Sequence, residues 1–326
     1  MSAPKHDLLC IGNAIVDVLA SVDPAVIADL GATPGSMTLI DAATAQDIEN
    51  RIAVERVAGG GSGANTAVVA ARMGAKVSYL GKVAEDQAGT HFTQDIRDQG
   101  LTFPSQPLAA SEKIPTARCI VLVTPDGQRT MFTYLGACTE FTPADVHEET
   151  VTDAAITYME GYLYDKPHAQ AAFEHAATLA RKAGRQVALT LSDTFCVGRH
   201  HAAFRGLVAG HVDILFANEA ELLALYETTD FEEALRQVAA ETQLAIVTRS
   251  EKGAVVISKG ERHDVPTTPV KVVDTTGAGD AFAAGFLAGL SKQHDLVTCA
   301  KLGNQAAGAI ITRFGARPQE DFTLRA

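Results

Sequence analysis

A turn of small residues between two acidic side chains is the stretch of this sequence best suited to chemistry. Residues 274–282 read Asp-Thr-Thr-Gly-Ala-Gly-Asp-Ala-Phe. The apolar residues 270–273 before them predict a short buried strand, whereas Phe282, Phe286 and Leu287 fall on one face of a helix. Backbone N–H groups that converge at a helix start attract anions, and the helix dipole adds to the attraction. The turn therefore predicts a phosphate site.

Asp280 lies at the same predicted helix start. A carboxylate beside an anion site is electrostatically unfavourable unless it has a chemical role or a cation nearby. One such role is that of a general base, which takes the proton of a hydroxyl group as the hydroxyl attacks a phosphoryl group. The alternative is an Asp that only caps the helix. The turn alone leaves both interpretations open.

A second glycine-rich segment precedes another predicted helix. Residues 59–65 read Gly-Gly-Gly-Ser-Gly-Ala-Asn, and glycines ahead of a helix let a ligand approach the backbone closely. The spacing Gly59-x-Gly61-x-x-Ala64 also satisfies the dinucleotide fingerprint of dehydrogenases, but such short patterns are frequent and a structural turn is the alternative. The phosphate-loop pattern Gly-x-x-x-x-Gly-Lys-Ser/Thr is absent from the whole chain.

Polar side chains also follow predicted strands. Asn13 and Asp17 stand in otherwise apolar company, and a buried Asp is costly unless it is hydrogen-bonded. Asp17 is therefore either paired within the fold or placed in a cleft that binds hydroxyl groups. Asn218 and Glu221 stand between a strand and a helix, where they suit water or Mg²⁺ near phosphates. Plain helix capping is the alternative for this pair.

Composition limits the class of protein. The chain has 326 residues, 47% hydrophobic and 20% charged, as in an ordinary soluble globular protein. Its formal net charge of -12 argues against a general nucleic-acid or acidic-membrane surface, because such surfaces need clustered Lys and Arg. The five scattered cysteines predict reduced core residues in a cytoplasmic protein. No stretch is apolar and long enough to span a bilayer, and the N-terminus resembles a first strand more than a signal peptide.

The elements that must position these residues alternate regularly. Apolar runs of strand length at 155–159, 186–191, 212–217 and 244–248 are separated by helical patterns near 166–183, 219–226 and 231–241. This alternation predicts an α/β fold with a doubly wound, mostly parallel sheet and helices on both faces. Two β-rich runs at 117–124 and 129–135, joined by Pro125-Asp126-Gly127, predict a hairpin. We expect this hairpin to leave the main sheet and join an excursion near residues 13–45 as a small second layer.

The expected sheet brings distant residues to one edge. Ligands of doubly wound sheets bind beyond the carboxyl ends of the strands. By this rule Glu160, Asn218, Glu221, Arg249 and Asp280 lie at the same edge as the glycine turn. Their convergence favours a functional site over a set of unrelated helix caps.

Three motifs taken together resemble the PfkB (ribokinase-like) family of carbohydrate and nucleoside kinases. They are Gly60-Gly61 with Asn65, Asn218-x-x-Glu221 and the highly specific segment 274–282. The resemblance extends from residue 7 to about residue 318. Within the family, Gly12-Asn13-x-x-x-Asp17 and the segments 133–137 and 310–316 look most like adenosine kinases and their bacterial relatives.

The resemblance implies a single ribokinase-like kinase domain over residues 1–326, with an α/β core and a β-rich lid formed by about residues 13–45 and 117–137. It also implies ATP as phosphoryl donor, with Mg²⁺. Asp280 matches the catalytic base of the family, and Gly277, Ala278 and Gly279 match the anion hole that stabilises the transferring phosphoryl group. Asp17 matches the carboxylate that binds the sugar diol.

The resemblance also places the remaining site residues. Those that match the acceptor pocket are Asn13, Gly60, Gly61, Asn65, Leu135, Ala137 and Tyr162. Those that match the ATP site are Asn218, Thr248, Lys252, Gly253, Thr275, Gly277, Gly279, Asn304, Ala307 and Gly308, of which the last three suit close helix packing equally well. Asn218 and Glu221 match a Mg²⁺ site reached through water. Asp274, Arg313 and Gly315 match a site for a monovalent cation such as K⁺.

The sequence therefore predicts an ATP-dependent kinase that phosphorylates the 5′-hydroxyl of adenosine or a related nucleoside. A sugar kinase for ribose or a ketohexose is the alternative within that class. A catalytically silent nucleotide-binding regulator and a dehydrogenase are the alternatives from other classes. The expected partner is a small-molecule nucleoside or sugar, with no nucleic acid and no membrane, and the expected state is a monomer or homodimer.

Overall fold

Eight strands form the larger of two β-sheets in the computed structural model, which describes residues 3–319 and 322–326. Their order is β13 (Glu261–Val265), β12 (Ala254–Ser258), β11 (Leu244–Thr248), β10 (Ile214–Asn218), β9 (Gln186–Thr190), β8 (Ala154–Glu160), β1 (His6–Ile11) and β5 (Val77–Leu80). Neighbouring strands are parallel from β11 to β5, whereas β12 is antiparallel to both of its neighbours, β11 and β13. The predicted mostly parallel sheet is confirmed.

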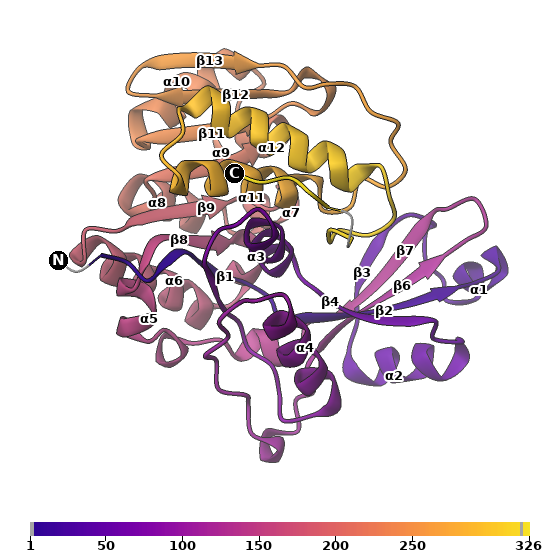
Figure 1. The fold of residues 1–326 in the computed structure, drawn as a ribbon. Coiled ribbons are helices and arrows are strands. Elements are labelled where there is room, and N and C mark those ends of the chain that lie inside the picture. Colours follow the sequence, from indigo (N-terminus) through magenta and orange to yellow (C-terminus); the bar gives the residue numbers. More distant parts are fainter. Residues whose placement is uncertain (1–2, 320–321) are drawn as a thin grey trace.

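Helices cover both faces of this sheet, as predicted (Figure 1). In β1, Leu8 and Cys10 pack into one apolar core and Leu9 and Ile11 into the other, because successive side chains of a strand point to opposite faces. The first core is closed by α3 (Ser62–Arg72), α4 (Gln87–Asp98), α11 (Ala278–Ser291) and α12 (Leu296–Ile311). The second is closed by α5 (Glu148–Thr152), α6 (Pro167–Lys182), α7 (Thr194–Arg199), α8 (His201–His211), α9 (Glu219–Leu225) and α10 (Phe231–Glu241).

A second, five-stranded sheet projects from the side of the larger one (Figure 1). Its order is β3 (Met37–Leu39), β7 (Arg129–Tyr134), β6 (Ala117–Val123), β2 (Ile15–Ser21) and β4 (Arg56–Gly60). The predicted hairpin is confirmed as the antiparallel pair β6 and β7, and it joins the excursion after residue 13 as expected. The sheet also includes β4, which lies beyond the expected limit of the excursion at residue 45.

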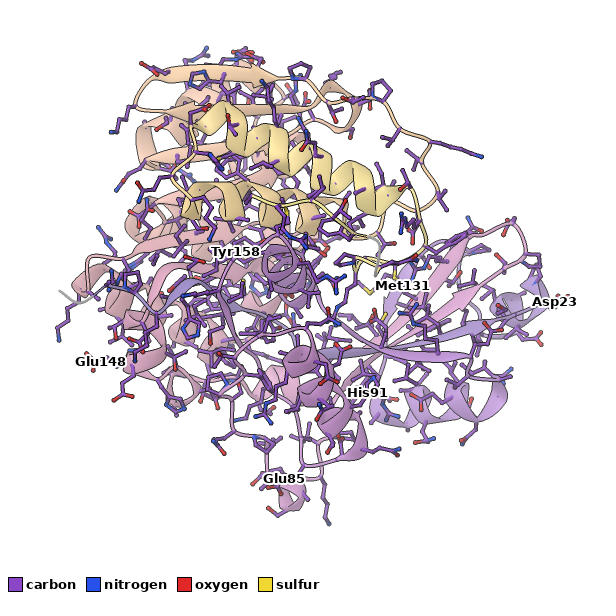
Figure 2. All side chains as sticks on the ribbon, viewed as in Figure 1. Asp23, Glu85, His91, Met131, Glu148 and Tyr158 are labelled. Carbon is purple, nitrogen blue, oxygen red and sulfur yellow. The ribbon has the colours of Figure 1, made fainter. Side chains whose placement is uncertain are left out.

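The two faces of the small sheet differ in what covers them. Helices α1 (Pro24–Asp29) and α2 (Ala42–Arg51) pack on one face, against side chains that include Val18, Ile120 and Phe132. The alternate side chains, which include Asp17 and Met131, point to the opposite face and line a cavity. Met131 is labelled in Figure 2, where the small sheet meets the rest of the molecule. Strand periodicity thus turns one face of the small sheet into a wall of the cavity.

The expected buried strand at residues 270–273 is wrong. Residues 266–273 form no strand, and the side chains of Val270, Val272 and Val273 are exposed. The backbone N–H groups of Val273 and Asp274 both donate to the carbonyl oxygen of Ile311 at the end of α12. This segment is therefore attached to the end of a helix rather than to a strand, and its apolar side chains are not part of a sheet.

Helices α11 and α12 pack closely against each other at two glycines. A Cβ on Gly285 of α11 would lie 2.6 Å from the carbonyl oxygen of Leu302 on α12. A Cβ on Gly303 of α12 would lie 2.8 Å from the carbonyl oxygen of Phe282 on α11. Neither position has room for a side chain, so glycine lets the two helix backbones approach each other closely.

Two further expectations concern the whole molecule. In the part of the chain that the structure describes, no helix has the length and apolar character needed to cross a membrane. Cys10, Cys119, Cys138, Cys196 and Cys299 are all buried, and none of these five forms a disulfide. Their predicted place in the core is confirmed.

Candidate active site

A cavity of about 1380 Å³ lies between the carboxyl ends of the main-sheet strands and the open face of the small sheet. It brings together residues that are far apart in the sequence. The predicted site residues that line it are Asn13, Asp17, Gly61, Asn65, Leu135, Tyr162, Asn218, Glu221, Thr248, Thr275, Gly277, Ala278, Gly279, Asp280 and Gly315. Of the residues that the sheet-edge rule placed at this edge, Glu160, Asn218, Glu221 and Asp280 line the cavity. Arg249 does not line it, because its side chain forms an ion pair with Glu219 at 2.8 Å.

Other predicted site residues lie outside the cavity lining. Those residues are Gly60, Ala137, Lys252, Gly253, Asp274, Asn304, Ala307, Gly308 and Arg313. Ala137 is fully buried, Lys252 is exposed and Gly253 is buried in the turn before β12. Asn304 donates from Nδ2 to the carbonyl oxygens of Val265 and Pro266 and thereby holds the loop after β13 against α12.

Asp280 does not cap its helix. The N-cap of α11 is Gly277, with no side-chain cap, and Asp280 occupies the third helical position. Its carboxylate accepts a hydrogen bond of 2.6 Å from Ser62 Oγ and one of 3.2 Å from Asn65 Nδ2. Burial raises the pKa of Asp280 to about 6, and these two hydrogen bonds act in the opposite direction. The carboxylate is thus oriented by α3 and is poised to take up a proton near neutral pH.

The start of α11 is open to a ligand. Gly277 has a φ of 76°, and a Cβ there would lie 2.5 Å from the Cβ of Ala316, so this position requires glycine. Gly279 is exposed, and a Cβ there would meet no atom within 4 Å. The first N–H groups of a helix have no partner within the helix and attract anions. The open space beside Gly279 therefore leaves these N–H groups accessible to an anion such as phosphate.

Two consecutive glycines, Gly60 and Gly61, let the side of the cavity around Asp17 form. A Cβ on Gly60 would lie 2.4 Å from the Asp17 carboxylate, so that side chain lies directly against the backbone of β4. Gly61 has a φ of 92°, and a Cβ there would lie 2.1 Å from the carbonyl oxygen of Asn13. Burial raises the pKa of Asp17 to about 6, while Arg317 and Arg129 act to lower it. The glycine segment is therefore a packing requirement of the cavity.

Glu160, which the sheet-edge rule placed near the site without a role, is a buried acid at the end of β8. It accepts hydrogen bonds from the backbone N–H of Asn13 at 3.1 Å, from Asn13 Nδ2 at 2.8 Å and from the backbone N–H of Gly63 at 2.6 Å. Burial raises its pKa to about 7, opposed by these hydrogen bonds and reinforced by Asp280. Glu160 thereby joins the end of β1 to the start of α3.

Asn218 and Glu221 form a capping box at the start of α9. Asn218 Oδ1 accepts from the backbone N–H of Glu221 at 2.8 Å, and Glu221 accepts from the backbone N–H of Asn218 at 2.9 Å. Burial raises the pKa of Glu221 to about 7. The capping interpretation is confirmed, and both residues also line the cavity. Within residues 3–319 and 322–326, no three His, Cys, Asp or Glu side chains gather as metal ligands.

Two arginines were absent from the predicted site. Arg129 of β7 forms an ion pair with Asp274 and donates to Thr276 Oγ1 at 3.2 Å, so it joins the small sheet to the glycine turn. Hydrogen bonds from Thr276 and Gly315 outweigh the effect of burial and lower the pKa of Asp274. Arg317 lines the cavity beside α3. The contact of Arg129 with Asp274 and that of Arg317 with Asn65 of α3 each join segments more than 140 residues apart, and no local sequence pattern predicts them.

The dinucleotide interpretation of the glycine segment is wrong. Gly59 lies within β4, an antiparallel edge strand of the small sheet, and Gly61 follows the end of that strand. The fingerprint of dehydrogenases requires a parallel strand of a βαβ unit before the glycines.

Comparison with known proteins now decides the class. Residues 31–321 match the pfkB family of carbohydrate kinases. The chain belongs to the PfkB family. Among solved structures, it is similar to adenosine kinase from Sinorhizobium meliloti, with 48% identity, a TM-score of 0.88 and coverage of 96% of each chain.

Two more relatives of this PfkB kinase extend along nearly its whole length. The structure of a probable sugar kinase from Rhizobium etli CFN 42 is 46% identical, has a TM-score of 0.88 and covers 97% of this chain and 96% of its own. Adenosine kinase of Saccharomyces cerevisiae is 29% identical over 339 residues, which cover 97% of this chain and 96% of that protein. The predicted family and ribokinase-like fold are confirmed, and the protein is a phosphotransferase with an alcohol group as acceptor.

Proposed function

We propose that this PfkB kinase transfers the γ-phosphoryl group of ATP to the 5′-hydroxyl of adenosine or a related nucleoside. The observation that carries the proposal is the composition of the cavity wall. Asp17 lies in the wall formed by the small sheet, among apolar side chains that include Leu19, Val121 and Met131. A carboxylate suits a ribose diol, and the apolar surface around it suits a base. The similarity to two adenosine kinases supports the same assignment.

In this proposal Asp280 is the general base. Its carboxylate accepts the proton of the 5′-hydroxyl as that oxygen forms a bond to the γ-phosphorus, and the bond from phosphorus to the bridging oxygen breaks to release ADP. The N–H groups at the start of α11, around Gly277 and Gly279, bind the negative charge of the transferring group. Ser62 and Asn65 keep the Asp280 carboxylate in one orientation before the reaction.

Residues for the donor lie on the main-sheet side of the same cavity. Thr248 and Thr275 line it, and we assign them to ATP together with the glycine turn. Asn218 and Glu221 would hold Mg²⁺ through water; their donor set of one amide and one carboxylate suits a hard cation that keeps most of its waters. When bound, Mg²⁺ would neutralise phosphate charge.

Adenosine should outperform free ribose and fructose by a wide margin as acceptor. A bare sugar would leave the apolar wall partly hydrated, whereas a base covers it. Removing one hydroxyl of the diol should leave Asp17 under-satisfied and cost about 1 to 3 kcal/mol, so 2′-deoxyadenosine should be roughly tenfold to hundredfold less efficient. A coupled assay of ADP release with all four acceptors measures both differences.

Two Asp→Asn variants serve as matched controls for the acceptor test. Asp17→Asn should remove most of the preference for adenosine over 2′-deoxyadenosine. Asp23→Asn changes an exposed cap of α1, at the outer end of the small sheet in Figure 2, and should keep that preference. Better turnover with a free sugar than with any nucleoside would support a sugar kinase instead, which is the class named for the Rhizobium etli relative.

We assign the small sheet to a lid over the acceptor. Closing it would exclude water, which otherwise competes as phosphoryl acceptor. Adenosine should therefore slow hydrogen exchange in β2, β6 and β7 more than ATP does. Helix α6, on the far face of the main sheet, provides the reference segment, in which neither ligand should change exchange. Equal protection of the small sheet by both ligands would contradict this role.

A monovalent-cation site near Asp274 and Gly315 would order the glycine turn from behind. Gly315 donates its N–H to the Asp274 carboxylate at 2.9 Å, so the two loops are already joined. Turnover should be higher in K⁺ than in tetramethylammonium at equal ionic strength, because only K⁺ is small enough to be coordinated by carbonyl oxygens in these loops. Equal rates in both salts would remove the cation from the proposal.

A further inference from the structure

Arg317 makes a chain of contacts that ends at the proposed base. Its Nε donates to Asn65 Oδ1 at 3.1 Å, and Asn65 Nδ2 donates to the Asp280 carboxylate at 3.2 Å. Asn65 is buried, with 7% of its surface exposed, and lies one turn into α3. Three segments of the chain thus meet in one line, from the C-terminal segment through α3 to α11.

The chemistry of the amide makes this contact directional. An Asn side chain carries an acceptor oxygen and a donor NH₂ group of nearly the same shape, so either atom can occupy either place. If the amide of Asn65 were turned over, its oxygen would face the Asp280 carboxylate and repel it. A guanidinium group has only donors, so Arg317 can accept no hydrogen bond from an NH₂ group. Its Nε therefore favours the orientation that directs Nδ2 at Asp280.

The guanidinium group of Arg317 is itself held in place. Its Nη1 forms an ion pair with Asp95 of α4, and the side chain is 15% exposed. A Cβ on Gly59 would lie 2.7 Å from Nη1 and 2.9 Å from Nη2, so the guanidinium packs against bare backbone. Asp95 and Gly59 together leave the Nε–H little freedom to turn away from Asn65.

We propose that Arg317 is a positioning residue for catalysis, which fixes the amide of Asn65 and through it the carboxylate of Asp280. The proposal rests on the role of Asp280 as base in the proposed function. Without Arg317 the amide loses its preferred orientation, and the carboxylate loses a hydrogen bond that favours its charged form.

Other titratable groups face Asp280 and must be separated from this effect. Glu160 and Tyr158 of β8 and Tyr162 after it interact electrostatically with Asp280. Arg317 also acts on Asp17, whose pKa it lowers. A change at Arg317 could therefore reach the reaction through Asp17, without Asn65. The experiment therefore needs a variant that removes the hydrogen bonds of Asn65 to Arg317 and Asp280 but leaves Asp17 unchanged.

The test is Arg317→Gln, made in the wild-type protein and in Asn65→Ala. The carboxyl carbon of Asp280, assigned by its absence in Asp280→Asn, is titrated by NMR in the ligand-free protein, and the acid limb of kcat is measured beside it. In the wild-type background we expect both to move upward by roughly half to one pH unit, with kcat below the limb falling roughly threefold to tenfold. In the Asn65→Ala background we expect Arg317→Gln to cause no additional shift in the Asp280 titration or in the acid limb of the kcat–pH profile.

Two variants exclude a merely structural role. Arg325 Nη1 donates to the carbonyl oxygen of Arg72, so Arg325→Gln also removes a tether between the C-terminal segment and α3, without touching Asn65. It should leave the Asp280 titration and the acid limb where they are. Arg317→Lys keeps the charge and a donor group, and it should give a shift between those of wild type and Arg317→Gln. It also keeps the test available if Arg317→Gln folds poorly.

Several outcomes would overturn the proposal. One is an Asp280 titration that is unchanged by Arg317→Gln in the wild-type background. Another is a shift in the Asn65→Ala background as large as that in the wild-type background, which would assign the effect to Asp17. A higher KM for the acceptor with an unmoved titration would instead assign Arg317 to acceptor binding, through its buried Nη2. Because the titration needs no substrate, it tests the link from Arg317 to Asp280 even if no nucleoside proves to be phosphorylated.

Discussion

Asp280→Asn should slow turnover by roughly 10² to 10⁴, which is the usual contribution of a general base. The amide cannot take up the hydroxyl proton, although it occupies the same space at the third position of α11. Both side-chain contacts can persist, because the oxygen of the new amide can accept from Asn65 Nδ2 while its NH₂ group donates to the hydroxyl oxygen of Ser62. Thermal stability and ATP binding should therefore change little. Steady-state kinetics with saturating ATP and adenosine, together with ATP titration, measure both expectations.

Asp295→Asn is the matched control for this prediction. Asp295 is the N-cap of α12 and accepts from the backbone N–H of Thr298 at 2.9 Å, so it has the role that the sequence left open for Asp280. Asn caps helices about as well as Asp, and Asp295→Asn should keep wild-type turnover. If Asp280→Asn retains more than half of wild-type activity, Asp280 is not the base.

Gly61→Ala should destabilise the protein and weaken acceptor binding together. The backbone at Gly61 has a φ of 92°, and holding a side chain in such a sparsely populated region costs about 1 to 3 kcal/mol. The new Cβ would also lie 2.1 Å from the Asn13 carbonyl oxygen, so Asn13 must move. Because Asn13 lines the cavity, we expect a higher KM for the acceptor as well as a lower free energy of unfolding in urea.

Gly74→Ala separates the two causes. Gly74 has a φ of 99°, close to that of Gly61, but a Cβ there would meet no atom within 4 Å. It should therefore show the loss from backbone strain alone, with an unchanged KM. Equal losses of stability in the two variants, with no change in KM for either, would show that the contact with Asn13 is unimportant.

The parts of the fold that follow from local periodicity could be predicted from the sequence. Buried strands alternating with amphipathic helices from residue 155 onward, and the hairpin around Pro125-Asp126-Gly127, depend on neighbours within a few residues. The edge rule then placed Glu160, Asn218 and Glu221 in one cavity with the glycine turn. Residues 270–273 failed the same test, because an apolar run becomes a strand only where a sheet offers it a partner.

The contacts that orient the candidate site could not be predicted. Glu160 holds Asn13 and the start of α3, Arg129 holds Asp274, and Arg317 holds Asn65, all across long separations in the sequence. Their side chains act through the three-dimensional arrangement of loops, which no single-sequence pattern encodes. Asn218 and Glu221 show the converse, since their local spacing already indicated a helix cap as one of two interpretations, and the capping box is present.

The close packing of α11 on α12 makes the proposed base sensitive to residues that no ligand reaches. Asp280 and Gly285 belong to the same rigid helix and are separated by about 7.5 Å along its axis, at 1.5 Å per residue. A side chain added at Gly285 or Gly303, where the two helices meet, must displace α11 as a rigid body, and the Asp280 carboxylate moves with the helix. A misplacement of about 1 Å can lower a rate by about 10²-fold. Substitutions at this helix contact would thus alter the catalytic rate while leaving every residue that lines the cavity unchanged.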